Sequence, residues 1–379
     1  REHRRPPGLG HGRAVLRVAL PLARPALAAG VALAIMEALA DFGAVNLLGY
    51  RAMTDAIYRV WYGTFDQAGA LQLASVLLSF TLLLVLGERL LRGRARYHGA
   101  LVRGQAVVPK RLRGPSAWAA AALPSVLLVL VVGAPLAQLV VWSIESLGEG
   151  ATTEALLRAA ANSLLLASLA AAVTTLLATV IAYGRRTHPS RAGGIAANLS
   201  ALGYAVPGTV IAVAIYQPLA WVDRNLGLGL VLTGTVVGLL LAYSVRFHAM
   251  ALSALGARME RIDPSLDDAA RSLGADRSRV LADVHLPLLW PGMVTAALLV
   301  FVEVMKELPA TALLRPLGGD TLAVAVWEAT KDSRFDTAAL PALLIVAVGL
   351  VPVIMLVRLS RRGEAMTEEP ALLGGRGSG

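Results

Sequence analysis

Eight stretches of this chain stay apolar for about twenty residues or more, and this pattern restricts the possible folds more than any other feature. A helix needs about 20 apolar residues to cross the roughly 30 Å hydrocarbon core of a bilayer, and buried helices of soluble proteins are usually shorter. The sequence therefore predicts an all-α polytopic membrane protein with about eight transmembrane helices. The stretches lie at approximately 26–48, 70–91, 118–143, 161–184, 194–216, 228–248, 290–314 and 338–359.

Charge gives the expected orientation of these helices. The net charge is +10, which on a soluble chain would suggest a nucleic-acid partner, but only 16% of the residues are charged and 56% are hydrophobic. Of the 35 Lys and Arg residues, 27 fall in the alternate segments 1–24, 88–117, 185–193, 246–288 and 358–379. The positive-inside rule places such segments in the cytoplasm. We therefore expect both chain ends to be cytoplasmic, and no nucleic acid as a partner.

An internal repeat relates the two ends of the chain at an offset of 266 residues. Residues 18–25 (VALPLARP) resemble residues 284–291 (VHLPLLWP), and at this offset Glu37 aligns with Glu303 and Asp41 with Glu307. Two apolar stretches belong to each copy, but four precede the second copy and none precedes the first. The repeat predicts two fused halves, with the first four helices of the first half missing.

The expected domains follow from this division. They are the C-terminal part of the first half (1–91), a basic cytoplasmic linker held against anionic headgroups (92–117), the complete second half (118–360) and a cytoplasmic tail (361–379).

A motif lies in the long segment 253–287, between the sixth and seventh apolar stretches. It consists of Asp268, Ala269, Ala270 and Gly274, followed after a gap by Leu286 and Pro287. Alanines allow close helix approach, a glycine allows the chain to turn out of a helix, and a proline suits a first helical turn. A plain amphipathic loop between two spans is the alternative interpretation.

This motif resembles the EAA motif (E-A-A-x-x-x-G, then I-x-L-P) of ABC importer permeases. The resemblance implies a type I importer permease fold, with a short coupling helix that docks on an ATPase subunit and with Asp268 in place of the usual Glu. The first copy has Gly8 and Pro21 in the equivalent places, but His3 and Arg4 replace the two alanines. Docking by the first copy is therefore the weaker expectation.

Two further segments, 203–209 (GYAVPGT) and 302–311 (VEVMKELPAT), are similar to ferric-iron permeases. This resemblance implies a subunit of a bacterial inner-membrane importer that takes iron(III) from an extracytoplasmic binding protein. Two ATPase subunits would use the ATP, and this chain would bind no cofactor. Thiamine and phosphonate permeases look similar, so these and other small solutes remain alternative substrates.

Charged residues inside a membrane span are costly and usually functional. Glu303, Lys306 and Glu307 share one helical face and could neutralise one another. Alternatively, Glu303 and Glu307 face Glu37 and Asp41 across a translocation path, where carboxylates suit a hard trivalent cation. A lining that releases its cargo is expected rather than a stable metal site. We expect Tyr204, Pro207 and Gly208 to serve helix kinking and close packing.

Other classes of function fit the sequence less well. The chain has only three lysines, none after a glycine, so it lacks the loop that holds phosphates in an ATPase. No convergent catalytic set is found, so we do not expect an enzyme. A secondary transporter also uses repeats and midplane carboxylates, but it would not need the motif at 268–287.

Overall fold

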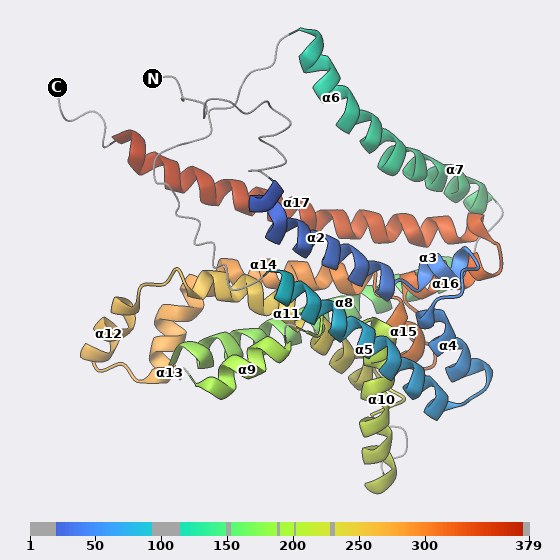
Figure 1. Ribbon diagram of the computed structural model, residues 1–379, viewed down its shortest axis with the longest axis horizontal. Coiled ribbons are helices and arrows are strands. Elements are labelled where there is room, and N and C mark those ends of the chain that lie inside the picture. Colours follow the sequence, from blue (N-terminus) through green and yellow to red (C-terminus); the bar gives the residue numbers. More distant parts are fainter. Residues whose placement is uncertain are drawn as a thin grey trace.

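The computed structural model describes residues 20–92, 114–148, 153–187, 190–200, 202–227 and 232–373, and within these ranges it contains helices and turns but no strand. Most of the long helices run in nearly the same direction, with α9 and α12 at one end of the molecule and α4 and α16 at the other (Figure 1). The first elements are α2 (Leu20–Ala40), α3 (Gly43–Leu47), α4 (Met53–Gly63), α5 (Gln67–Arg92), α6 (Pro115–Leu128), the π-helical turn η2 (Val129–Gly133) and α7 (Ala134–Gly148). They are followed by α8 (Thr153–Thr187), α9 (Arg191–Ser200), α10 (Gly208–Asn225), α11 (Val236–Met259), α12 (Pro264–Ser272), α13 (Arg277–Arg279), the π-helical turn η3 (Val280–His285), α14 (Leu286–Met305), α15 (Pro309–Leu314), α16 (Leu322–Lys331) and α17 (Phe335–Leu373).

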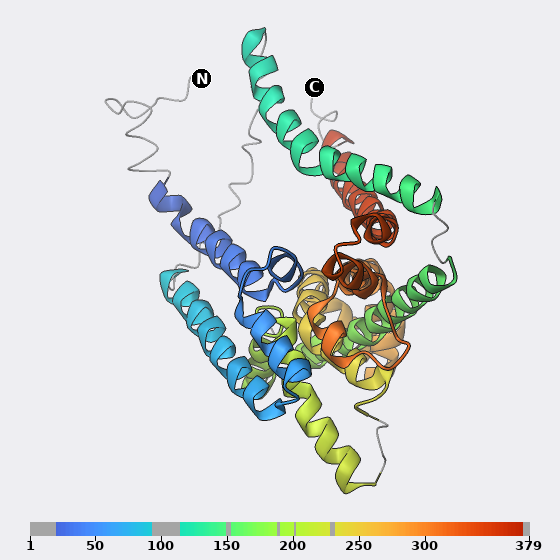
Figure 2. The same ribbon diagram turned by 90° about the vertical axis from the view of Figure 1, so that its right-hand side faces the viewer.

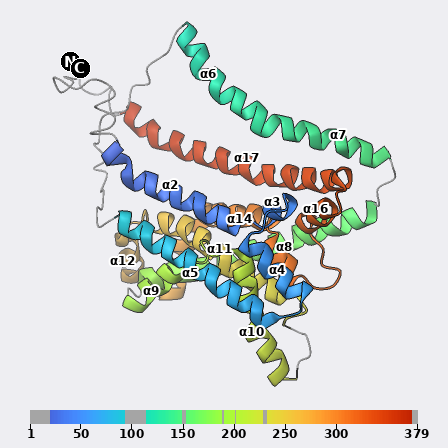
Figure 3. The ribbon, with the colours of Figure 1, turned by 45° about the vertical axis from the view of Figure 1, so that its right-hand side comes forward.

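Helices α8, α11 and α14 form the centre of the bundle. Small side chains such as Ala170, Ala242 and Ala296 are fully buried between them, which lets the three backbones approach closely. Helices α5 and α10 pack on one side of this centre, and α17 packs on α14, α16 and α7. In Figure 3, α7 lies along the outer side of α17, and α6 continues from α7 away from α17. Most of the apolar side chains of α6 and α7 are exposed, as is usual for a surface that faces lipid or another subunit.

Among the described residues, six helical stretches are long and apolar enough to cross a membrane: 67–90, 117–148, 154–187, 236–259, 277–305 and 335–358. The predicted all-α membrane fold is therefore confirmed, whereas the count of eight single spans is not. Three of the expected spans are interrupted. The run 26–48 breaks at 41–42, the run 194–216 breaks between α9 and α10, and the run 290–314 breaks at 306–308.

The break between α9 and α10 has identifiable causes. Pro207 has extended backbone angles and ends the interruption before α10. At Gly203, a Cβ atom would lie 2.2 Å from the carbonyl oxygen of Val245, so only glycine permits this approach of the loop to α11. Apolar length alone did not distinguish a continuous span from two short helices.

Both π-helical turns end two residues before a proline. η2 precedes Pro135 and η3 precedes Pro287. A proline donates no hydrogen bond, and its ring crowds the carbonyl four residues earlier. A wider π turn moves the chain around that position without ending the helix.

The offset of 266 residues is also visible in the structure. The series α2, α3, α4 and α5 in the first copy corresponds to α14, α15, α16 and α17 in the second, and the first members start at Leu20 and Leu286. Seen in Figure 2, the blue first copy and the red α17 lie on different sides of the molecule. Helix α3 of the first copy nevertheless contacts α16 of the second, where Trp327 donates a 3.0 Å hydrogen bond to Asn46.

Candidate translocation cavity and coupling helix

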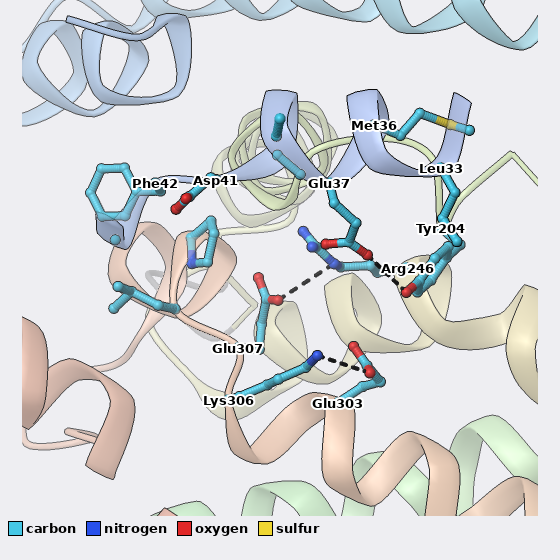
Figure 4. A pocket seen from close by; sticks show the side chains of 15 residues that line it. Leu33, Met36, Glu37, Asp41, Phe42, Tyr204, Arg246, Glu303, Lys306 and Glu307 are labelled. Atoms are coloured by element: carbon cyan, nitrogen blue, oxygen red, sulfur yellow. Dashed lines mark hydrogen bonds and ion pairs between the residues drawn. The ribbon is translucent and has the colours of Figure 1, made fainter. Parts of the chain in front are cut away.

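A cavity of about 520 Å³ lies where the breaks of the two copies meet. All four carboxylates that the sequence predicted for a path line it: Glu37, Asp41, Glu303 and Glu307. They are joined there by Tyr204, Arg246 and Lys306. Figure 4 shows Glu37 on α2, Glu303 on α14 and Glu307 in the break after α14 directed into this space. Side chains 266 residues apart in the sequence therefore share one polar site.

Glu307 is the most enclosed of these carboxylates. One oxygen accepts a 3.0 Å hydrogen bond from the backbone N–H of Ala310, and the other lies 3.4 Å from Nε of Arg246. The Glu307 side chain thus caps the start of α15 and forms an ion pair with the middle of α11.

Gly208 makes room for this ion pair. A Cβ atom at Gly208 would lie 2.2 Å from Nη1 of Arg246 and 2.5 Å from a Glu307 carboxylate oxygen. The predicted role of Gly208 in close packing is therefore confirmed, and the structure shows what it packs against. Nη1 of Arg246 has no hydrogen-bond acceptor within the described part of the chain, so the guanidinium keeps a donor for another group beside its ion pair with Glu307.

The remaining carboxylates have looser partners. Glu303 forms a 3.0 Å ion pair with Lys306, whose side chain is 58% exposed. Glu37 accepts a 3.0 Å hydrogen bond from the hydroxyl of Tyr204. Asp41 accepts a 3.1 Å hydrogen bond from the backbone N–H of Ala44. Tyr204 therefore contacts a cavity carboxylate directly, which the sequence analysis had not expected.

The cavity does not have the geometry of a closed metal centre. In the ranges that the structure describes, no three His, Cys, Asp or Glu side chains gather closely enough to hold a metal ion. A cation entering the cavity would have to replace Lys306 or Tyr204 as the partner of a carboxylate. Such exchange suits passage better than storage.

The expected coupling segment contains a short surface helix, α12. Asp263 caps its start by accepting a 2.9 Å hydrogen bond from the backbone N–H of Ser265, and Pro264 occupies the first turn. Gly274 follows the helix with a φ of +84°, a conformation that favours glycine. Leu273 is 89% exposed. A capped helix with an exposed apolar side chain is a suitable contact for a partner protein.

The predicted motif residues fall into different environments. The side chain of Asp268 is 76% exposed, and among the described residues it pairs only with Arg271 of its own helix. Ala269 is exposed and Ala270 half-buried. Leu286 and Pro287 lie in the first turn of α14, but the chain is already helical from Arg277. Pro287 therefore lies in the first turn of an α-helix, as the sequence predicted, although η3 joins α13 to α14 without an interruption.

Parts of the first copy and of the linker lie outside the description. Gly8, and most of the expected linker 92–117, fall outside the described residues. Pro21 is the second residue of α2, in the same place as Pro287 in α14. At the other end of the chain, α17 continues to Leu373, into the segment expected as a tail.

The sequence did not predict two charged residues that make buried contacts, Arg246 and Asp267. Arg246 was counted in a cytoplasmic segment, but α11 continues to Met259 and places it in the cavity wall. An arginine within an otherwise apolar run was the signal that could have found it. The other residue is Asp267, which is buried although its neighbour Asp268 is exposed.

Asp267 is ionised in a partly enclosed site. Burial by itself would raise the pKa of this carboxyl, but the hydrogen bond from Arg186 and the nearby His285 outweigh burial and hold the pKa below its usual value. Nothing in the motif distinguished Asp267 from Asp268. Only the contacts of α12 with the bundle separate the two.

Comparison with known proteins identifies the family. Residues 174–364, half of the chain, match the family described as "Binding-protein-dependent transport system inner membrane component". The chain belongs to this family. It is therefore a multi-pass component of a transport system in the inner membrane, and its family is one of transport rather than of catalysis.

Individual relatives add detail. The chain is 29% identical over 343 residues to the Fe(3+)-transport system permease protein FbpB 2 of Haemophilus influenzae. The match covers 89% of this chain and 66% of that protein. It is 31% identical to a putative 2-aminoethylphosphonate transport system permease protein, PhnV, of Salmonella paratyphi A, over 40% of this chain and 61% of that protein. The chain thus spans about two thirds of the length of these relatives, or slightly less.

The fold has a solved counterpart. A permease chain in the crystal structure of a bacterial alginate ABC transporter, bound to a periplasmic protein with an alginate pentasaccharide, superposes with a TM-score of 0.52 at 17% identity. The match covers 65% of this chain and 94% of that one. It confirms an ABC importer permease fold.

Proposed function

We propose that this chain forms part of the membrane path of an ATP-driven importer for iron(III). The observation that carries the proposal is the convergence of Glu37, Asp41, Glu303 and Glu307 on one cavity at the helix breaks. Carboxylate oxygens are suitable ligands for a hard cation. The similarity to an Fe(3+)-transport permease over 89% of the chain supports the same cargo.

The four carboxylates have unequal parts in this proposal. Glu307 is held by Arg246 and by the start of α15, so its main task is to keep the break in shape. Glu303 and Glu37 have partners that can leave, namely the exposed Lys306 and the hydroxyl of Tyr204. We expect these two carboxylates to meet the cation.

The family to which the chain belongs supports a proposal for the machinery around the path. An extracytoplasmic binding protein delivers the cargo, and two ATPase subunits supply the energy. One ATPase subunit docks on α12, through the exposed Leu273 and Asp268, and Gly274 allows the chain to turn away after the contact. The end of the molecule that carries α12 then faces the cytoplasm, together with both chain ends, and the segments 1–91, 92–117, 118–360 and 361–379 are the partial first half, the linker, the second half and the tail.

An anionic cargo is the second candidate. The observation in its favour is that Nη1 of Arg246 has no acceptor among the described residues and that Lys306 is exposed in the same cavity. A phosphonate would bind these two cations, and the similarity to a 2-aminoethylphosphonate permease covers 40% of the chain.

An uptake experiment separates the two cargoes. The complete transporter that contains this chain, with its binding protein and ATPase in proteoliposomes, is supplied with radioactive iron(III) or with labelled 2-aminoethylphosphonate. We expect iron uptake that falls about tenfold or more in Glu303→Gln. The matched control is Glu154→Gln, at an exposed ion pair in the first turn of α8. Uptake of the phosphonate and not of iron would refute the iron proposal.

A further inference from the structure

Asp267 joins α12 to two long helices of the bundle. Its Oδ2 accepts a 2.9 Å hydrogen bond from Nε of Arg186, and its Oδ1 lies 2.8 Å from Nε2 of His285. Arg186 is in the last turn of α8, and His285 is the last residue of η3, directly before α14. We call these three residues the buried joint. All three are largely shielded from solvent.

Arg186 holds more than the carboxylate. Its Nη1 donates to the carbonyl oxygens of Met259 and Ile262, at 3.0 and 2.9 Å, and its Nη2 lies 3.4 Å from that of Asp263. These carbonyls belong to the end of α11 and to the turn that leads into α12. One guanidinium therefore fixes the position of α12 relative to α8 and α11.

His285 is completely buried and has a defined orientation. The ring of Tyr183 on α8 meets it edge-on at 5.2 Å, and the hydroxyl of Tyr183 donates a 2.8 Å hydrogen bond to the carbonyl of Arg277. Nδ1 has no partner within the described residues. Nε2–H is then the donor to Asp267, and this assignment follows from the hydrogen-bond network. The contact joins α12 to the start of α14.

The two helices held by the joint connect it to two distant parts of the molecule, the cavity and the opposite end of the bundle. Helix α14 runs from the joint to the break at Lys306, where the cavity lies. Helix α8 runs to the opposite end of the molecule, about 35 Å from Arg186 at 1.5 Å per residue. There Asn162 donates to the carbonyl of Asp320, and Ser163 accepts from the backbone N–H of Leu322.

We propose that Asp267, through Arg186 and His285, transmits the movement of the docked α12 to α8 and α14. A buried carboxylate separated from its partners would be left as an unpaired charge, so the three groups move together rather than slide. Asp268 contacts the ATPase, and Asp267 passes the movement on as a positioning residue. The proposal rests on the proposed docking of an ATPase subunit on α12.

The adjacent carboxylates provide a matched pair of variants. In the complete transporter, Asp267→Asn and Asp268→Asn are compared for co-purification of the ATPase, for hydrolysis stimulated by the loaded binding protein, and for cargo transported per ATP. We expect Asp267→Asn to keep the ATPase bound within about twofold while transport per ATP falls about tenfold. Asp268→Asn should instead weaken ATPase binding, by no more than about fivefold because one exposed pair contributes about 0–1 kcal/mol, and should lower hydrolysis and transport in proportion.

His285 gives a second test that does not alter α12. In His285→Gln the amide can still donate to Asp267, so coupling should be largely kept, whereas His285→Leu removes the donor and should uncouple. If Asp267→Asn fails to reach the membrane, the two His285 variants still test whether the buried joint transmits movement. Equal transport per ATP in the Gln and Leu variants would overturn the proposal, as would equal values for Asp267→Asn and Asp268→Asn.

Failure of the docking proposal is recognised separately. Leu273→Asp should release the ATPase, because it places a charge in the exposed apolar contact of α12. If the ATPase stays bound to this variant, α12 is not the docking helix. If Leu273→Asp releases the ATPase but the Asp267 and His285 variants couple normally, α12 is the docking helix and the buried joint does not transmit its movement.

Discussion

The two copies of the repeat break their membrane helix at the same place and cap the next helix in the same way. In the first copy Asp41 accepts a hydrogen bond from the N–H of Ala44, at 3.1 Å, and in the second copy Glu307 accepts one from the N–H of Ala310, at 3.0 Å. The residue pairs differ in number by 266 at both positions. A carboxylate three residues before a helical N–H is a local device, so it is retained wherever the sequence is retained.

The copies differ in what surrounds the cap. Glu307 is buried, with Arg246 at 3.4 Å and Gly208 making room for both. Asp41 is only half-buried, and no ion pair reaches it within the described ranges. Lys306 of the second copy aligns with Ala40 of the first. The local sequence is therefore enough to form the break. The ion pair at the second break depends in addition on Arg246 from α11 and on the room left by Gly208 on α10.

Arg246→Met should have the largest effect. It leaves the buried Glu307 without its cation, and breaking a buried pair by removing one partner costs about 3–5 kcal/mol. We expect the free energy of unfolding, measured in mixed micelles, to fall by about 3 kcal/mol. Arg158→Met, at an exposed ion pair with Glu154, is the control and should cost less than about 1 kcal/mol. Similar losses for the two variants would show that Glu307 needs no partner.

Gly208→Ala should have the second-largest effect on stability. The added Cβ would collide with Arg246 and Glu307, and overpacking typically costs about 1–3 kcal/mol. Iron uptake by the complete transporter should fall along with stability. Gly184→Ala on α8 is the matched control, because nothing lies within 4 Å of its Cβ position. An unaffected Gly208→Ala would mean that the ion pair has room to shift.

Replacing each capping acid by its amide compares the two copies directly. Both Glu307→Gln and Asp41→Asn keep an oxygen for the helix cap, but only the first leaves a buried cation, Arg246, without its counter-ion. We expect Glu307→Gln to lower the free energy of unfolding by about 2 kcal/mol and Asp41→Asn by less than about 0.5 kcal/mol. Equal losses would remove the distinction between the copies.

Lys306→Met should have the smallest effect on stability. Its ion pair with Glu303 is partly exposed, and such pairs contribute about 0–1 kcal/mol. Its effect should appear in transport instead, because Glu303 without its lysine would hold a cation longer. We expect more iron to be retained by the purified transporter and slower uptake. Unchanged retention would indicate that Lys306 does not compete with the cargo.

Much of this architecture followed from local properties of the sequence. Apolar length predicted the helices, the repeat predicted that Glu37, Asp41, Glu303 and Glu307 belong together, and the glycine at 274 predicted the turn after α12. Each of these depends on neighbours in the chain or on an internal copy. The interruptions at 41–42 and 306–308 were not predicted, because a capping carboxylate inside an apolar run looks the same as a charge within a continuous helix.

The sequence by itself determined that the chain crosses a membrane as helices and where its acidic residues stand along them. Only the tertiary structure decided which acid is held and which is free. Arg246 reaches Glu307 from a helix about sixty residues earlier in the chain, and no local pattern contains that pairing. Asp267 and Asp268 are neighbours, yet about 100° of helical rotation turns one to Arg186 and the other to solvent. Which face of α12 is buried depends on the helices packed beneath it.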